Sequence, residues 1–83
     1  MKMHFITFRS ITPAQRGERL LKQAGIDAWL QRTPRWMEAQ GCGYCLRLPE
    51  HRTQAAVALL QRDRIPFSKV YAWNAGRAEE WKP

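Results

Sequence analysis

Hydrophobic residues along the chain recur at two spacings, one typical of strands and one typical of helices. Residues 4–9 are β-branched and aromatic and predict a strand. A helix is expected next, because Thr12 suits an N-cap, Pro13 suits the first helical position and Gln15 completes a capping box. The apolar stripe of this helix comprises Ala14, Gly17, Leu20, Leu21 and Ala24. Gly25 is expected to stop the helix, because glycine readily adopts a left-handed conformation.

The rest of the chain alternates strands and a helix in a similar way. Residues 27–31, 44–48 and 67–73 predict three further strands. A second helix is expected to open at Pro49 and to close before Pro66, since proline disfavours helical backbone in the residue before it. Its expected inward residues are Ala55, Ala56, Leu59 and Leu60.

A weak internal repeat indicates two similar halves. Residues 20–27 resemble residues 59–66, since each segment has paired leucines, a polar turn and an isoleucine that leads into a strand. Two strand–helix–strand halves predict an α+β fold, the ferredoxin-like βαββαβ sandwich, with a four-stranded antiparallel sheet and two helices on one face. Residues 1–83 are expected to form a single domain with its core in residues 4–73, followed by a loosely packed C-terminal tail over residues 74–83.

The other face of the predicted sheet would be open. In the last strand Val70 and Ala72 alternate with two aromatic residues, and the smaller pair suits the helix side better. The open face would then carry Tyr71, Trp73, Phe5 and Trp29. Such a patch favours a protein partner or a homodimer, whereas a register shift of one residue would reverse every side chain.

Charge and composition narrow the functional classes. The net charge of +7 and the pI of about 10.3 favour an anionic partner, although a basic surface can also serve solubility alone. No apolar run approaches the ~20 residues of a membrane span, and the N-terminus lacks the apolar segment of a signal peptide. Two cysteines make no disulfide framework, so we expect a cytoplasmic protein without membrane contact. No catalytic acid–base constellation is visible in the sequence, which is more typical of a carrier than of a stand-alone enzyme.

The two cysteines form a Cys-x-x-Cys motif that begins near the end of residues 33–43, a stretch without clear periodicity that we interpret as a loop. Thioredoxin-type motifs lie at a helix N-terminus, which lowers the thiol pKa, but here a strand follows. A dithiol oxidoreductase is therefore less favoured, and the two cysteines become unequal. Cys42 is the accessible loop sulfur, while Cys45 lies within the strand. A zinc site would need four ligands, and the two histidines are isolated in the sequence.

The surroundings of Cys42 suit a reactive sulfur. Gly41 and Gly43 would let a bulky donor approach closely. Arg35 and Arg47 are near in sequence and could stabilise a thiolate or persulfide anion. A thiolate is the form that accepts a sulfur or selenium atom. We therefore predict a reactive site at Cys42, with Cys45 as at most its helper.

Several short segments occur in an order typical of one family. They are Phe5-Ile6-Thr7-Phe8, Leu20-Leu21-Lys22-Gln23-Ala24-Gly25-Ile26, Thr33-Pro34-Arg35, Cys42-Gly43 with Leu46-Arg47, and Ala58-Leu59-Leu60 with Ile65. Over residues 4 to about 73 the chain resembles the selenium/sulfur carrier protein-like family, DUF3343. The resemblance implies a ferredoxin-like domain that carries the chalcogen on Cys42 as a transient persulfide or selenide, without another cofactor. It also implies sulfur or selenium donor and acceptor proteins as partners.

Two other functions stay open on the sequence alone. The same element order underlies the RNA-recognition motif, and residues 43–48 faintly resemble one of its RNA-binding strands. The chain could also be a protein-interaction or dimerisation domain that uses the open sheet face.

Overall fold

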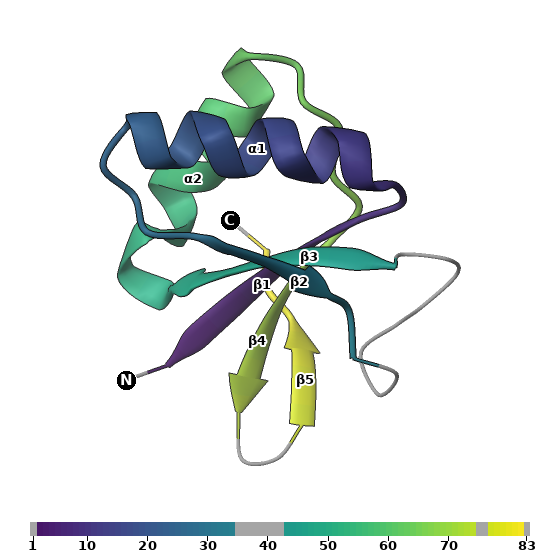
Figure 1. The fold of residues 1–83 in the computed structure, drawn as a ribbon. Helices are drawn as coiled ribbons and strands as arrows, with labels where there is room; N and C mark the ends of the chain where they lie inside the picture. The colour runs from purple at the N-terminus through teal and green to yellow at the C-terminus, as the bar shows by residue number, and fades with distance from the viewer. Residues whose placement is uncertain (1, 35–42, 75–76, 83) are drawn as a thin grey trace.

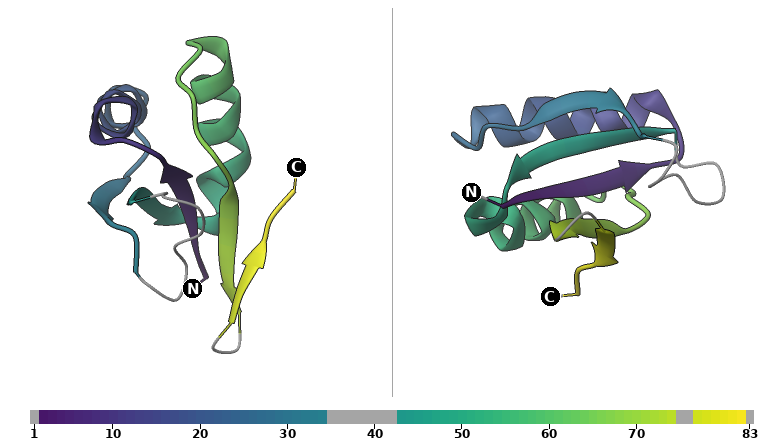
Figure 2. Two further views of the ribbon diagram at one scale, coloured as in Figure 1. Left: turned by 90° about the vertical axis from the view of Figure 1, so that its right-hand side faces the viewer. Right: turned by 90° about the horizontal axis from the view of Figure 1, so that it is seen from below.

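Two helices and an antiparallel sheet of five strands form the part of the chain that the computed structural model describes, residues 2–34, 43–74 and 77–82 (Figure 1). The elements are β1 (Met3–Phe8), α1 (Ile11–Gln23), β2 (Trp29–Arg32), β3 (Tyr44–Pro49), a 3₁₀ turn (Glu50–Arg52), α2 (Thr53–Arg62), β4 (Val70–Asn74) and β5 (Arg77–Glu80). The spatial order of the strands is β2-β3-β1-β4-β5. Both helices lie on the same side of the sheet (Figures 1 and 2).

The main core lies between the sheet and the two helices. Its fully buried side chains include Ile6 and Phe8 of β1, Leu46 and Leu48 of β3, Leu21 of α1 and Leu60 of α2. Gly17 lets α1 approach closely, because a Cβ atom there would lie 3.1 Å from Leu60 Cδ2 and 3.2 Å from Leu46 Cδ1. This core places the residues of alternate parity, among them Cys45, on the other side of the sheet.

Both helices end in the same backbone motif, which is the structural form of the weak sequence repeat. At the end of α1 the N–H of Ile26 donates to the carbonyl oxygen of Leu21 at 2.8 Å, and Gly25 has a φ of 80°. At the end of α2 the N–H of Ile65 donates to the carbonyl oxygen of Leu60 at 2.9 Å. Arg64 there takes the left-handed position with a φ of 56°. These are Schellman motifs, and the predicted stop at Gly25 is confirmed.

The predicted starts of the two helices are wrong by a few residues. Helix α1 begins at Ile11 after an extended Ser10, so Thr12 lies inside the helix and is not its N-cap. Pro13 is still tolerated, because the first helical turn has no intrahelical partner for an N–H. The second helical segment begins with the 3₁₀ turn, and α2 follows.

The inward face of α2 also differs from the prediction. The buried residues of α2 are Thr53, Ala56, Val57 and Leu60, whereas Ala55 is exposed and Leu59 is half-buried. The stripe is rotated toward the valine, which offers more apolar surface to bury than Ala55.

The expected loose tail is wrong, and with it the count of four strands. Residues 77–80 form β5, which pairs antiparallel with β4. The N–H of Trp81 then donates to the carbonyl oxygen of Val70 at 2.7 Å, and the indole packs on the main core. The Trp81 ring also lies 5.7 Å from the ring of the buried His4. The apolar surface of Trp81 and the backbone pairing anchor a segment that is polar in sequence apart from this tryptophan.

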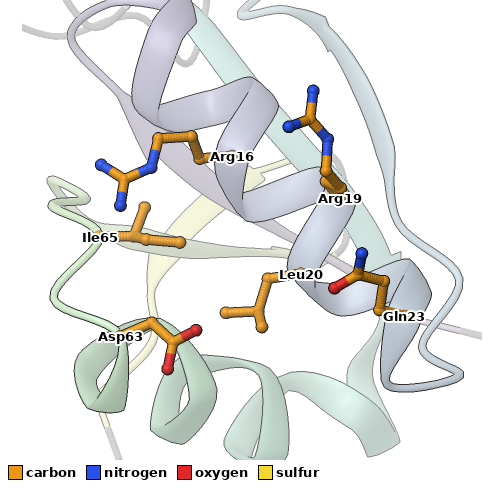
Figure 3. Close-up of a pocket in the computed structure, with 6 residues that line it drawn as sticks. All are labelled: Arg16, Arg19, Leu20, Gln23, Asp63 and Ile65. Atoms are coloured by element: carbon orange, nitrogen blue, oxygen red, sulfur yellow. The ribbon is translucent and has the colours of Figure 1, made fainter.

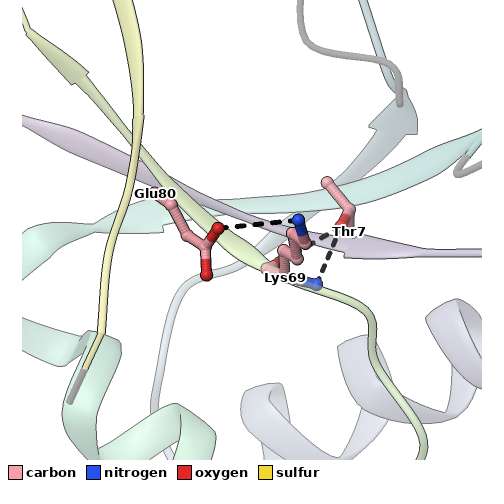
Figure 4. A network of polar contacts seen from close by, with 3 residues as sticks. All are labelled: Thr7, Lys69 and Glu80. Atoms are coloured by element: carbon pink, nitrogen blue, oxygen red, sulfur yellow. Dashed lines mark hydrogen bonds and ion pairs between the residues drawn. The ribbon is translucent and has the colours of Figure 1, made fainter. Parts of the chain in front are cut away.

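Strand β4 begins three residues later than predicted. Before it, the hydroxyl of Thr7 donates to the carbonyl oxygen of Lys69 and accepts the N–H of Lys69, both at 3.1 Å (Figure 4). This side chain therefore takes part in the junction that leads into β4. From there the register confirms the predicted alternation: Val70 faces the helices and Tyr71 pairs with Phe5 on the opposite face.

Candidate functional site

The pairing of β2 with β3 brings together the residues that precede and follow residues 35–42. The N–H of Thr33 donates to the carbonyl oxygen of Gly43 at 3.0 Å. One step further, Arg32 pairs with Tyr44, and its guanidinium carbon lies 5.4 Å from the tyrosine ring centroid. Gly43, the described residue next to Cys42 in sequence, is thus held by the backbone of Thr33, directly after β2.

Cys45 is fully buried and free on β3. Its neighbours in the sheet are Gln31 of β2 and Thr7 of β1. Burial raises the pKa of the Cys45 thiol, because a thiolate would lose its hydration there. The nearby side chain of Thr33, the charge of Arg47 and the side chain of Gln31 each lower the pKa, but burial outweighs them. At neutral pH this sulfur is therefore a protonated, poorly reactive thiol.

Arg47 lies on the same face of β3 as Cys45, as the alternation predicted. Its side chain is exposed, and its guanidinium carbon lies 5.2 Å from the ring centroid of Trp29 on β2. This is the geometry of a cation–π contact. Arg47 thus places a positive charge on this face and close enough to Cys45 to favour its anionic form.

Three of the predicted site residues, Arg35, Gly41 and Cys42, lie outside the described residues, and their roles stay predictions. Gly43 is described and half-buried. A Cβ atom on Gly43 would meet no heavy atom of the described residues within 4 Å. The role of Gly43 in letting a bulky donor approach Cys42 stays a prediction.

Two contacts of Cys45 were missed in the sequence. Gln31 and Thr33 lie close enough to the Cys45 thiol to lower its pKa, yet neither residue type points to a thiol site by itself. Thr33 belongs to one of the segments that resemble the family, but the resemblance assigns no role to this residue. Their place beside Cys45 depends on the pairing register of β2 with β3.

A separate depression of about 280 Å³ lies on the helix layer, between α1 and the chain that follows α2 (Figure 3). It is lined by Arg16, Arg19, Leu20, Gln23, Asp63 and Ile65. Figure 3 shows the two arginine side chains pointing in different directions rather than converging. The lining contains no cysteine or histidine, so it offers no thiol chemistry.

Metal binding and membrane insertion find no support in the described residues. Within them, no three histidine, cysteine, aspartate or glutamate side chains gather as a ligand set. Neither described helix has the length and apolar character needed to span a bilayer.

A family model described as "Putative Se/S carrier protein-like" matches residues 3–72. The chain belongs to this family. The match to the Se/S carrier-like family runs from β1 into β4, and it includes both cysteines of the sequence. Comparisons with curated proteins and with solved structures find no match. The family resemblance seen in the sequence is thereby confirmed.

Proposed function

We propose that this Se/S carrier-like protein accepts a sulfur or selenium atom on Cys42 as a persulfide-type adduct and passes it to an acceptor protein. One observation carries the choice of residue. The sequence has two cysteines, and the thiol of Cys45 is fully buried with a raised pKa. If the family chemistry uses a cysteine, Cys42 is the better candidate for the nucleophile.

The proposed transfer needs no net oxidation or reduction. The Cys42 thiolate attacks the outer sulfur of a donor persulfide, the sulfur–sulfur bond of the donor breaks, and the donor thiolate leaves. An acceptor thiolate then attacks the outer sulfur on Cys42, and the Cys42 thiolate leaves. Arg35 and Arg47 would stabilise the anionic sulfur between these steps. Donor and acceptor proteins are therefore the proposed partners, and no resident cofactor is needed.

The proposed helper role of Cys45 is a different reaction. Its thiolate would attack the inner sulfur on Cys42, form a Cys42–Cys45 disulfide and release hydrosulfide, after which a thiol reductant must restore the pair. Because Cys45 is fully buried and its pKa is raised, this route needs a local opening of the sheet. We therefore expect release through Cys45 to be slower than transfer to an external thiol. A free-thiol carrier of this kind fits a reducing compartment, the cytoplasm.

We also assign the fold to the ferredoxin-like class, extended by one strand. The order β2-β3-β1-β4 with both helices on one side supports this assignment, and β5 is an addition beyond the matched residues.

Mass spectrometry of the intact protein after incubation with glutathione persulfide tests the function. We expect a mass increase of one sulfur atom in the wild type and in Cys45→Ala, and none in Cys42→Ser. The Cys45→Ala variant is the matched control, since it removes the buried thiol and keeps the proposed carrier. Circular dichroism checks that each variant is folded. An adduct of equal yield in Cys42→Ser, or no adduct in the wild type, would refute the proposal.

A further inference from the structure

A lateral row of five side chains crosses the sheet on the face opposite the helices. The strand register pairs Trp29 with Arg47, Arg47 with Phe5, Phe5 with Tyr71, and Tyr71 with Glu80. Directly paired residues of antiparallel strands point to the same side of a sheet. The row therefore runs Trp29, Arg47, Phe5, Tyr71, Glu80 from β2 to β5. We call this side of the sheet the open face.

The open face is exposed only in part: Cys45 and Thr7, which share this side of the sheet, are buried, whereas two tryptophans on it are exposed. Trp29 is 44 % exposed, and Trp73, two residues beyond Tyr71 on the same face of β4, is 39 % exposed. Phe5 is recessed at 9 % exposure, whereas Arg47 and Glu80 are exposed. Exposed tryptophan, tyrosine and arginine side chains are the types that dominate protein interfaces. This composition indicates that the open face binds a protein.

The order of charged and aromatic side chains along the row indicates which protein would bind to the open face. A cation, two aromatic rings and a carboxylate follow one another in Arg47, Phe5, Tyr71 and Glu80. A two-fold axis parallel to the strands, between β1 and β4, reverses this row in a second copy. Arg47 of each copy then faces Glu80 of the other, and Phe5 faces Tyr71. We propose that the open face binds a second copy of this chain in a symmetric, face-to-face dimer.

The partner of Glu80 within one chain does not prevent this contact. The Oε1 atom of Glu80 lies 3.6 Å from Nζ of Lys69, and both side chains are partly exposed (Figure 4). An exposed ion pair of this kind contributes little and can rearrange. Within the described residues, Arg47 forms no ion pair, and its guanidinium lies over Trp29. The carboxylate of a second copy would therefore meet a cation that already lies on the open face.

The net charge of +7 on each copy opposes association, but its distribution limits the effect. Exposed arginines such as Arg16, Arg19 and Arg62 belong to the helix layer, on the far side of the sheet. Two packed sheets lie about 10 Å apart, which already exceeds the Debye length of about 8 Å at physiological ionic strength. The repulsion between the helix layers is therefore largely screened.

Sedimentation velocity from micromolar to millimolar concentration, at physiological ionic strength, tests the dimer. We expect Arg47→Glu and Glu80→Arg to raise the dimer Kd at least about 10-fold each, because each places like charges opposite one another twice. The double variant Arg47→Glu/Glu80→Arg exchanges the two charges and should return the Kd to within about 3-fold of the wild type.

Charge-matched controls separate the local contact from the change in net charge. Arg19→Glu lies on α1, and Glu79→Arg pairs with Ala72 on the helix side of β5; both residues are exposed. We expect these variants to leave the dimer Kd unchanged. Circular dichroism confirms folding of all variants.

Three results would overturn the proposal. They are a protein that stays monomeric at millimolar concentration, single variants that match their controls, and a double variant weaker than both singles. A monomer whose tryptophan fluorescence is quenched by single-stranded RNA would assign the open face to nucleic acid instead. The inference does not rest on the proposed carrier function, because the dimer Kd is measured without any chalcogen donor.

Discussion

Arg64 occupies, at the end of α2, the left-handed backbone position that Gly25 occupies at the end of α1. The left-handed conformation costs a residue with a side chain about 1–2 kcal/mol. Glycine avoids this cost but adds about 0.4–1 kcal/mol of chain entropy to the unfolded state. The balance predicts that Arg64→Gly stabilises the fold by about 0.5–1 kcal/mol. For a domain of this size that corresponds to a rise in Tm of about 2–8 °C.

Thermal unfolding followed by circular dichroism, with urea titration at 25 °C, measures the effect. Arg64→Ala is the control, because it removes the charge and keeps the cost of the left-handed backbone; we expect no gain in stability. Gly25→Ala is the converse change. Its φ is 80°, and a Cβ atom there would meet no heavy atom of the described residues within 4 Å, so the change acts on the backbone alone. It should destabilise by about 1 kcal/mol or more. A Tm of Arg64→Gly no higher than that of Arg64→Ala would refute the reasoning.

Two further predictions concern a thiol and an imidazole. Iodoacetamide at neutral pH should alkylate Cys42 well before Cys45, because Cys45 is fully buried and its pKa is raised; peptide mass mapping measures both rates, and equal rates would contradict this. The pKa of His4 is lowered below 6.5, mainly by burial, so the fold favours the neutral ring. Its contribution to stability is complete above the unfolded-state pKa and is lost as pH falls through the lower folded pKa. We therefore expect urea stability to decline below about pH 6.5, and to decline less in His4→Phe; equal pH dependence of both proteins would be inconsistent with this.

Much of the fold could be predicted because its signals are local. The strand around β3 and the alternation in β4 follow from a period of two, and the end of α1 follows from the conformational freedom of Gly25. Strand β5 was missed because Arg77, Glu79 and Glu80 carry no hydrophobic alternation. Its signal was indirect, namely the turn-forming residues 74–76 and a tryptophan that needed a place in the core.

The candidate site was predictable only in part. The placement of Cys45 within a strand followed from the alternation after the loop, and β3 confirms it, whereas the reactivity of Cys42 stays a prediction. The position of Gln31 and Thr33 near the Cys45 thiol could not be predicted, because it depends on how β2 aligns with β3. Pairing register between strands joined by a long segment is a non-local property, which no window of sequence contains.

The carboxylate of Glu18 affects whether another strand can pair with the edge of the sheet. Strand β2 is an edge of the sheet, and the outward N–H of Leu30 already donates to Oε2 of Glu18 at 3.0 Å. Lys22, one turn along α1, holds that carboxylate at 3.5 Å. An incoming strand would have to displace Glu18 before it could form hydrogen bonds at this edge. The other edge is β5, whose charged side chains disfavour pairing with a further strand. Among the described residues, both edges of the sheet therefore carry groups that hinder pairing with a further strand.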